Sequence, residues 1–502
     1  MHRLSPRHPY PLYGTDTTRQ REQAAAAQLP PYTLMQRAGL AVARLAQAIA
    51  PHARTVWIAC GPGNNGGDGL EAAMHLHQAG RAVCVTWLGH PDHAPADARH
   101  AWLRARQAGV PFVETPPAHL GATDLVIDAL LGLGVNAQAP ARPLNAAWHT
   151  TLAHMHATPA IQLAVDMPSG LDADTGQFAP GMEPPAMSTT PSARHTLSLL
   201  TLKPGLFTAH GRDACGELWW DDLGTESAPT DPDAWLSAPP PAPLRPHASH
   251  KGTQGDVAIL GGEGLQARGM GMGGAALLAA SAALHAGAGR VLVGLLDDGA
   301  MAIDTTQPEI MFRLPQRLDL PRLTVVCGCG GGEAIAPWLA PVLAQSPRLV
   351  LDADALNTIA TDPGLQALLQ QRQHQGHATI LTPHPLEAAR LLHSSTAEVQ
   401  ADRLAAARQL AEQFGCVAVL KGSGTVVAAP AATPLLNPTG NGRLGTAGTG
   451  DVLAGMIGAR LAAGAPALQA AAEAVHIHGR LADEWPRDIP LTASALARQG
   501  AA

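Results

Sequence analysis

Two glycine-rich stretches of this chain combine backbone that can approach a ligand closely with side chains that can transfer protons. The first is Gly61-Pro62-Gly63-Asn64-Asn65-Gly66-Gly67-Asp68-Gly69, which follows the strand-like run 55–60 and precedes a helical pattern that begins at Leu70. Such a loop presents backbone N–H groups to a ligand at the positive end of a helix. Its glycines also fit the pattern G-x-G-x-x-G, which predicts a dinucleotide ligand.

The surroundings of this loop do not favour hydride transfer. The next strand-like run, 83–88, ends at Gly89 without an acidic residue that could hold a ribose. The two asparagines and Asp68 add oxygen atoms that a simple phosphate loop does not need. The loop therefore predicts a nucleotide ligand that is not acting as a redox cofactor.

Two further strand-like runs of the first half end in a carboxylate. Residues 125–128 end at Asp128, and residues 163–166 end at Asp166, which is followed by Met167-Pro168-Ser169-Gly170. If these strands neighbour the first one, both aspartates, Ser169 and the oxygens of Asn64 and Asn65 converge on one cleft. An oxygen-rich cluster suits a hard or alkali cation, and its carboxylates could act as general acid or base. Either aspartate alone could equally be a cap for the segment that follows it.

The second glycine-rich stretch lies near the other end of the chain. Residues 441–451 end in Gly448-Thr449-Gly450-Asp451 and open the helical run 452–457. Their N–H groups would face an anion, and Asp451 could accept a hydroxyl proton as phosphate is transferred to that hydroxyl. The alternative is that Asp451 is only a helix cap. His384, between two prolines, and Lys421 also follow strand-like runs, although each could be a structural or solvated residue.

Composition narrows the class of protein. A chain of 502 residues predicts two or three domains, and a net charge of −7 argues against nucleic acid as a partner. The start of the chain lacks an apolar secretion signal, and 275–296 reads as a buried helix followed by a strand rather than a membrane span. The six cysteines lie mostly in strand-like runs, which predicts reduced thiols in a cytoplasmic enzyme. We interpret Cys327-Gly328-Cys329 as packing rather than a metal site.

A proline-rich stretch, 226–249, reads as a linker between two halves. Apolar runs alternate with helical patterns in both halves, which predicts two three-layer αβα domains with ligands at the carboxyl ends of parallel strands. One predicted helix runs from Glu398 to Phe414 and ends at Gly415. The expected strands are 55–60, 82–88, 124–128, 161–166, 196–202, 256–261, 290–296, 323–327, 348–352, 378–382 and 416–420.

The first half resembles the NAD(P)H-hydrate epimerase family in segments 34–39, 61–69, 128–132, 166–170 and 203–205. The resemblance implies a Rossmann-like domain over 1–225 that interconverts the S and R epimers of a nicotinamide cofactor hydrated at ring carbon 6. It implies potassium binding by Asn65, Asp128 and Ser169, with Asp166 as acid or base. The residues implied to hold the hydrated cofactor are Asn64, Asn65, Gly66, Gly67, Asp68, Gly132, Leu133, Gly134, Val135, Asn136, Ala137, Gln138 and Asp166.

The second half resembles the ADP-dependent NAD(P)H-hydrate dehydratases of the ribokinase-like superfamily in segments 250–252, 261–262, 274–276, 352–357, 382–387 and 448–451. The resemblance implies that residues 250–502 remove the hydroxyl of the S hydrate at the expense of ADP, through phosphorylation and elimination, with Mg²⁺ on the phosphates. Implied substrate contacts are Ala275, Gly332, His384 and the catalytic Asp451. Implied nucleotide contacts are Lys421, Gly422, Ser423, Gly424, Thr425 and Gly450.

The chain departs from the dehydratase pattern mainly in its glycine-rich segments. The stretch Cys327-Gly328-Cys329-Gly330-Gly331-Gly332 replaces G-P-G-L-G, so the assignment of Gly332 depends on how this segment folds. Glu263 stands where Ser is common, and Ala447 stands where Gly is common. The methyl group of Ala447 would constrain the backbone if that residue needed a positive φ.

The resemblances together predict a cytoplasmic, homo-oligomeric, bifunctional repair enzyme for NADHX and NADPHX, without nucleic-acid or membrane partners. Two alternatives remain open at this point. One is a vitamin-salvage kinase with an accessory first domain, which would form ADP from ATP on a vitamin alcohol. The other is a non-catalytic nucleotide-binding scaffold, which would be indifferent to the loss of Asp451.

Overall fold

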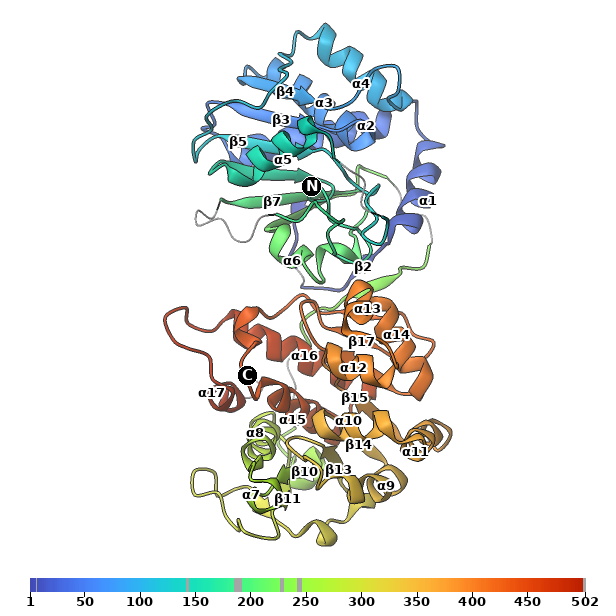
Figure 1. The fold of residues 1–502 in the computed structure, drawn as a ribbon, viewed down its shortest axis with the longest axis vertical. Helices are drawn as coiled ribbons and strands as arrows, with labels where there is room; N and C mark the ends of the chain where they lie inside the picture. Colours follow the sequence, from blue (N-terminus) through green and yellow to red (C-terminus); the bar gives the residue numbers. More distant parts are fainter. Residues whose placement is uncertain (6, 141–143, 185–191, 226–229, 242–245, 500–502) are drawn as a thin grey trace. The chain divides into compact units, whose positions relative to one another are not determined.

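The computed structural model describes residues 1–5, 7–140, 144–184, 192–225, 230–241 and 246–499 (Figure 1). These residues form two compact units that divide between Ala234 and Trp235, and the short segment ending at Tyr10 groups with the second unit. None of the helices in the described ranges is long and apolar enough to cross a membrane. All six cysteines are free.

The stretch expected as a linker contains a strand. Residues 226–229 and 242–245 of that stretch lie outside the described residues, but β9 (Ala234–Leu236) pairs in parallel with β18 (Leu435–Leu436). Ala234 and Leu236 form this strand because their side chains are fully buried. Alternating burial over three residues is too short a pattern to separate from loop in a proline-rich sequence.

A seven-stranded sheet forms the centre of the first unit. Its order is β1-β8-β7-β6-β5-β3-β4, and it is parallel except where β1 meets β8. The strands are β1 (His2–Arg3), β3 (Val56–Cys60), β4 (Val83–Trp87), β5 (Leu125–Ala129), β6 (Ile161–Val165), β7 (Arg194–Leu199) and β8 (Glu217–Asp221). The central strands are apolar on both faces because both faces are covered.

Helices cover the two faces of this sheet. Val56 and Ile58 pack under α2 (Thr33–Ile49), α3 (Asn64–Gln78) and α4 (Ala96–Gln107), while Trp57 faces α5 (Ala146–Ala157). The alternation of neighbouring side chains between faces makes the unit a three-layer αβα sandwich. The remaining helices are α1 (Thr15–Ala26), η1 (Pro204–Leu206) and α6 (Gly211–Ala214).

The second unit is built on an eleven-stranded sheet of order β12-β11-β10-β13-β14-β15-β16-β17-β18-β9-β2. The strands from β12 to β16 run parallel, and β17 is antiparallel to both of its neighbours. The bounds not yet given are β2 (Tyr10–Leu12), β10 (Asp256–Glu263), β11 (Arg290–Leu296), β12 (Met311–Phe312), β13 (Thr324–Cys327), β14 (Arg348–Leu351), β15 (Ala378–Leu381), β16 (Val417–Leu420) and β17 (Val426–Ala428).

One face of this sheet packs against α8 (Gly273–His285), α15 (Thr449–Ala462), α16 (Ala467–Asp483) and α17 (Ala493–Arg498). Val350 of β14 belongs to that core, while Leu349 and Leu351 are also fully buried and point to the other face. The other helices are α7 (Leu265–Arg268), α9 (Ala336–Gln345), α10 (Ala353–Thr361), α11 (Pro363–His374), α12 (Pro385–Leu391), α13 (Thr396–Ala401), α14 (Arg403–Phe414), η2 (Lys251–Gln254), η3 (Pro315–Arg317), η4 (Leu320–Arg322) and η5 (Gly442–Leu444).

The structure corrects two predicted helix boundaries. The segment expected as one helix over 398–414 forms two helices, because Asp402 adopts an extended conformation between them. Asp402 is the N-cap of α14: its side chain accepts a hydrogen bond from the N–H of Ala405. Gly415 ends α14 in the left-handed region, as expected. The helix expected to begin at Leu70 begins at Asn64, so the last six residues of the first glycine-rich stretch are already helical.

A close contact between α15 and α8 allows a test of packing in the second unit. A Cβ atom at Gly455 of α15 would overlap the backbone carbonyl oxygen of Ala279 in α8. Gly455→Ala is therefore expected to lower the free energy of unfolding by about 1–3 kcal/mol, measured by urea unfolding followed by circular dichroism.

Gly274 is the matched control, because it lies in α8 and a Cβ atom there would meet open space. Gly274→Ala is expected to leave stability unchanged or to raise it by up to about 1 kcal/mol, through helix propensity alone. Equal destabilisation by the two substitutions would contradict the close approach of α15 and α8.

Candidate active sites

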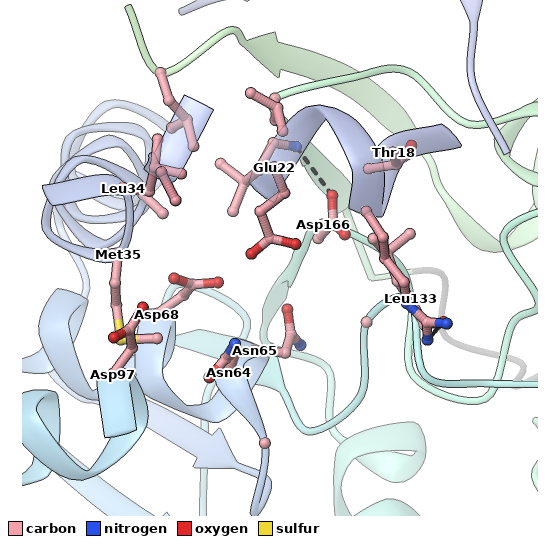
Figure 2. Close-up of a pocket in the computed structure, with 18 of the residues that line it drawn as sticks. Thr18, Glu22, Leu34, Met35, Asn64, Asn65, Asp68, Asp97, Leu133 and Asp166 are labelled. Carbon is pink, nitrogen blue, oxygen red and sulfur yellow. Dashed lines mark hydrogen bonds between the residues drawn. The ribbon is translucent and has the colours of Figure 1, made fainter. Parts of the chain in front are cut away.

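The first candidate site is a cavity of about 450 Å³ in the first unit. It is lined by Asn64 and Asn65 at the start of α3, by Asp166 after β6, and by residues of α1 and α2. Figure 2 shows that Glu22, Asp68 and Asp166 face this space from three different elements. The carboxyl ends of β3 and β6 thus supply side chains to one cavity, as expected for a parallel sheet.

Asp166 is held in an unusual conformation by a buried lysine. Its φ of 65° lies in the left-handed region, which a non-glycine residue adopts only when its surroundings enforce it. The ammonium group of Lys203, which is fully buried, pairs with Asp166 Oδ1 and donates to the carbonyl of Leu199 at 2.8 Å. The N–H of Leu199 donates to the same carboxylate at 3.0 Å. This pairing fixes the Asp166 carboxylate at the wall of the cavity.

Other acids in the cavity raise one another's pKa. The pKa of Asp68 lies well above its ordinary value because of burial and the nearby Asp166 and Glu22. Burial and Asp166 likewise raise the pKa of Glu22 in α1. Asp97 lines the same cavity. The cavity thus gathers several carboxyl groups around one space, and burial raises the pKa of two of them, which is an arrangement suited to acid–base chemistry.

Asp128 and Ser169 lie behind the wall of this cavity rather than in it. The carboxylate of Asp128 accepts hydrogen bonds from Ser169 Oγ at 2.5 Å, from Ser169 N–H at 2.9 Å and from Leu130 N–H at 3.2 Å. Leu130 lines the large cavity, whereas Asp128 and Ser169 line a separate cavity of about 50 Å³. The expected convergence on a single cleft is therefore realised for Asn64, Asn65 and Asp166 only.

The residues expected to hold potassium offer suitable donors. Ser169 Oγ lies close to an oxygen of Asp128 and 3.4 Å from the carbonyl oxygen of Leu131, so three oxygens meet at this point. The amide nitrogen of Asn65 is buried and has no hydrogen-bond partner among the residues that the structure describes. Because amide N and O positions are assigned from the hydrogen-bond network, turning this amide over would present an oxygen instead. Oxygen donors of this kind are those that hard cations prefer.

The remaining residues expected to hold the hydrated cofactor divide into two groups. Asp68, Gly132, Leu133 and Gly134 line the large cavity together with the asparagines and Asp166. Gly66, Gly67, Val135, Asn136, Ala137 and Gln138 are not among its lining residues. Gly66 and Gly67 are buried inside α3, and the N–H of Ala137 is bound to Asp172.

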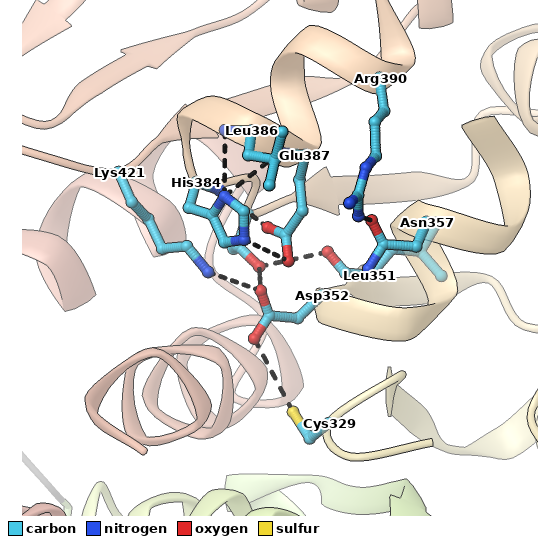
Figure 3. A network of polar contacts seen from close by, with 10 residues as sticks. Cys329, Leu351, Asp352, Asn357, His384, Leu386, Glu387, Arg390 and Lys421 are labelled. Carbon is cyan, nitrogen blue, oxygen red and sulfur yellow. Dashed lines mark hydrogen bonds and ion pairs between the residues drawn. The ribbon is translucent and has the colours of Figure 1, made fainter. Parts of the chain in front are cut away.

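The second candidate site lies at the carboxyl ends of the parallel strands of the second unit. Asp352 follows β14, and Thr382 and His384 follow β15. Asp352 Oδ1 accepts hydrogen bonds from Thr382 Oγ1 and from Lys421 Nζ, both at 2.8 Å (Figure 3). Lys421 follows β16, so three adjacent strands contribute to this network.

Asp451, Asp352 and Cys329 form a compact cluster beside this network. The Oδ atoms of the two aspartates and the Sγ of Cys329 lie within 4.8 Å of one another. Burial and the nearby Asp352 raise the pKa of Asp451 to about 7. Cys329 is fully buried in this cluster, with its thiol 4.0 Å from Asp352 Oδ2. A thiol and two carboxylates, one of them paired with Lys421, do not make a donor set that holds Mg²⁺ by itself.

The glycine-rich segment 327–332 brings Gly332 to this edge of the sheet. Gly332 has a φ of 54°, its N–H donates to Asp354 at 2.9 Å, and any Cβ there would overlap the buried carboxylate of Glu263. Ala275 of α8 lies against Gly330 of the same segment. Ala447 is not among the described residues with positive φ, so its methyl group does not strain the loop.

His384 has a clear structural role in addition to its position at the site. Its Nδ1 accepts hydrogen bonds from the N–H groups of Leu386 and Glu387, and the Glu387 carboxylate accepts one from the N–H of His384. This reciprocal cap starts α12. Burial and the nearby Lys421 lower the pKa of His384, which favours the neutral ring that an accepting Nδ1 requires.

The loop expected to bind a nucleotide connects β16 to β17. Gly422 and Ser423 are exposed, Lys421 and Thr425 are half-buried, and Gly424 is buried. A Cβ at Gly450 would lie 3.3 Å from Lys421 Nζ, so the start of α15 is next to this loop. The loop and the helix start, which also carries Asp451, thus lie side by side.

Several residues of the two sites escaped the sequence analysis as individual candidates. Lys203 and Asp352 each follow a strand, and the rule that located Asp128 and Asp166 could have located them too. Glu22 gives no such signal, because it lies in a polar helix more than a hundred residues from Asp166. Its place in the cavity depends on how α1 packs.

Comparisons with known proteins match both units. A family model described as "NAD(P)H-hydrate dehydratase" matches residues 259–498, and one described as "YjeF-related protein N-terminus" matches residues 31–205. The "Bifunctional NAD(P)H-hydrate repair enzyme Nnr" of Escherichia coli (strain K12) is 36% identical over 502 residues, covering 94% of this chain and 88% of the relative. The protein of the same name from Vibrio cholerae is 37% identical and covers 95% and 94%.

A shorter relative matches the second unit only. The "ADP-dependent (S)-NAD(P)H-hydrate dehydratase" of Neisseria meningitidis is 43% identical over 260 residues, which cover 50% of this chain and 84% of the relative. These names support cofactor repair over a vitamin-salvage kinase or a non-catalytic scaffold. The chain belongs to the family of bifunctional NAD(P)H-hydrate repair enzymes.

Proposed function

We propose that the first unit interconverts the S and R epimers of hydrated NADH and NADPH, and that the second unit dehydrates the S epimer at the expense of ADP. The observation that carries this proposal is that each unit has its own acid–base centre at the carboxyl edge of its own sheet. Asp166 with Lys203 forms one centre, and Asp451 beside Lys421 and the 421–425 loop forms the other. Epimerisation beside dehydration allows both epimers to be cleared.

In the second unit, Asp451 would act on the hydroxyl group at ring carbon 6. Its carboxylate accepts the hydroxyl proton while the oxygen attacks the terminal phosphoryl group of ADP, and AMP leaves. Phosphate then leaves with the carbon–oxygen bonding electrons, a proton is lost from the neighbouring ring carbon, and the double bond of the dihydronicotinamide is restored. His384, Ala275 and Gly332 would hold the hydrate beside Asp451.

In the first unit, Asp166 would transfer the proton that epimerisation needs. Carbon 6 of the hydrate carries both a hydroxyl group and the ring nitrogen, so either bond can open and close on the opposite face once a proton is moved. The cavity supports this role because the Asp166 carboxylate is fixed at its wall by Lys203 and Leu199. Asn64, Asn65, Asp68 and the 132–134 segment would hold the hydrate there.

Ions and co-substrate complete the proposal. ADP would bind at Lys421–Thr425 and Gly450, and the Neisseria relative's name supports ADP over ATP. Mg²⁺ would arrive on the phosphates of the nucleotide, where it neutralises charge during transfer. Potassium would bind Asn65 at the wall of the epimerase cavity together with Asp128 and Ser169 behind that wall. We also place the enzyme in the cytoplasm, consistent with six free cysteines, as a homo-oligomer that light scattering can test.

One experiment tests the two activities together. A mixture of S- and R-NADHX is incubated with ADP and Mg²⁺, and the return of dihydronicotinamide absorbance is followed. Complete recovery requires both units, whereas a halt after the S fraction indicates dehydration without epimerisation. No recovery with ADP, combined with phosphorylation of a vitamin alcohol by ATP, would contradict the proposal.

The pH dependence of dehydration should follow the ionisation of Asp451. Because only the ionised carboxylate accepts a proton, and its pKa is raised to about 7, kcat/KM is expected to fall about tenfold per pH unit below 7 and to level off above it. The groups that face Asp451 are Cys329, Asp352, Asp354 and Lys421. Steady-state rates at saturating ADP from about pH 5 to about pH 9 test this, and a flat profile would argue against Asp451 as the base.

A further inference from the structure

The lysine at the start of the proposed nucleotide loop is already paired. Lys421 Nζ lies 2.8 Å from Asp352 Oδ1 and is surrounded by the further carboxyl groups of Glu387 and Asp451. These acids, not a ligand, keep the pKa of Lys421 above its ordinary value although burial opposes this. An anionic nucleotide at this edge therefore meets a lysine whose charge is largely compensated. The positive potential that binds its phosphates needs another source.

A buried arginine lies directly beneath the loop. Arg403 begins α14 and is only 2% exposed. Its Nη2 donates to the carbonyl oxygens of Leu420 at 3.2 Å, Lys421 at 3.1 Å and Gly424 at 3.5 Å, and its Nη1 donates to Gln400 Oε1 at 2.6 Å. A Cβ at Gly422 would lie 2.9 Å from both Nη1 and Nη2. The loop thus rests on the guanidinium group.

The charge of Arg403 has no acidic partner. Within the described part of the chain, its hydrogen bonds go to backbone carbonyls and to one glutamine amide, and no carboxylate forms an ion pair with it. Burial lowers the pKa of Arg403 to about 10, so the group is still charged near neutral pH. A charge that is neither compensated nor exposed to water acts over several ångströms, because the medium around it screens poorly.

The same hydrogen bonds orient the peptide groups of the loop. In a trans peptide unit the C=O and N–H bonds point in opposite directions. Since the carbonyls of Lys421 and Gly424 turn inward to Arg403, the N–H groups of Gly422 and Thr425 turn away from it. Gly422 and Ser423 are exposed to solvent. Backbone N–H groups facing outward over a buried cation form an anion-binding concavity.

We propose that Arg403 is a positioning residue for nucleotide phosphates: it orients the 421–425 loop and supplies the uncompensated positive charge that favours an anionic ligand there. The inference rests on the proposed function of this loop as the ADP site. Arg403 does not touch the nucleotide, so its contribution should depend on how much negative charge the nucleotide carries. ADP carries more negative charge than AMP.

The test compares dissociation constants of ADP and AMP in the wild type, Arg403→Met and Arg403→Lys. They are measured by calorimetry without Mg²⁺, so that ADP keeps its larger negative charge. Removing the charge in R403M is expected to raise the dissociation constant of ADP about tenfold or more, and that of AMP distinctly less. R403K keeps the charge but not the planar fork, and should recover most of the preference for ADP. The ADP affinity of the wild type should also decline more steeply with salt than that of R403M.

Arg372 offers a matched control in the same unit. It is 1% exposed, burial lowers its pKa to about 10 as well, and it donates to the carbonyl of Leu343 and to Thr379 Oγ1, away from the 421–425 loop. Arg372→Met should cost comparable stability in thermal unfolding but leave the ratio of ADP to AMP affinity unchanged. The KM for the S hydrate should change little in either methionine variant.

The outcomes separate the inference from the function on which it rests. If R403M weakens ADP and AMP by the same factor, or changes neither, Arg403 is not a source of phosphate selectivity and the inference fails while the proposed function stands. If R372M alters the ratio as R403M does, the effect is generic and the inference also fails. If the wild type does not bind ADP, the proposed function is overturned, and the inference with it.

Discussion

Asp451→Asn is expected to abolish the ADP-dependent return of dihydronicotinamide, lowering kcat for dehydration by about 10²–10⁴-fold. The asparagine fills the same space and can still donate and accept hydrogen bonds, but it cannot accept the hydroxyl proton as the phosphoryl group is transferred. Exchange between the S and R hydrates should continue at the wild-type rate, because that chemistry belongs to the other sheet. The measurement is absorbance recovery from S-NADHX with ADP and Mg²⁺.

Asp362→Asn is the control for this substitution. Asp362 caps α11 through hydrogen bonds to the N–H groups of Gly364 and Leu365, and asparagine caps a helix equally well. It should leave both activities unchanged. Dehydration by Asp451→Asn at the wild-type rate would show that Asp451 is not the base and would favour the scaffold alternative for the second unit.

Asp166→Ala is expected to abolish exchange between the S and R hydrates, by a comparable factor of about 10²–10⁴, while ADP-dependent consumption of the S hydrate continues. The Asp166 carboxylate lies at the cavity wall and is the proton-transfer group in our proposal. Among the described acids that line the cavity, it is the one paired with Lys203. Recovery from a mixed-epimer sample should then stop once the S fraction is exhausted. Chromatographic separation of the epimers follows the exchange directly.

Asp166→Ala also leaves the buried ammonium of Lys203 without its partner, which can cost about 3–5 kcal/mol of stability. Asp166→Asn is the companion variant, because its amide oxygen still accepts from Lys203 and from the N–H of Leu199. It should be folded by circular dichroism and equally inactive in exchange. Loss of both activities in a folded Asp166→Asn protein would contradict independent sites.

The architecture was largely predictable from the sequence. Buried parallel strands such as Val56–Cys60 and Val417–Leu420 are continuous apolar runs, and the alternation of such runs with helical patterns identifies an αβα sandwich. The boundaries were less predictable. Asp402 splits a helix because its side chain accepts a hydrogen bond from the N–H of Ala405. The 3.6-residue periodicity of the surrounding sequence does not reveal this interruption. Very short strands such as β9 depend on their partners more than on their own sequence.

The sites were predictable where a residue ends a strand and unpredictable where tertiary packing decides. Asp166 follows from the rule that ligands bind at the carboxyl ends of parallel strands, whereas Asp451 follows from the glycine-rich stretch that opens a helix. The separation of Asp128 from the large cavity depends on the path of the backbone at Leu130, which no pattern specifies. Arg403 looks in the sequence like any charged residue of an exposed helix, and only its burial beneath Gly422 distinguishes it.

The strand β9 has a practical consequence for dividing this enzyme. The sequence suggests a cut near residue 250, but such a cut would remove Trp235 and Leu236 from their pairing with Leu435 and Leu436. The shortened protein would then present β18 as an unprotected sheet edge, with open backbone groups and newly uncovered apolar side chains, which promotes self-association. An expression boundary upstream of Ala234 keeps β18 paired with β9, although β9 then becomes the sheet edge because β2 is also removed. The segment that connects the two units in the sequence is thus also a strand in the sheet of the second unit.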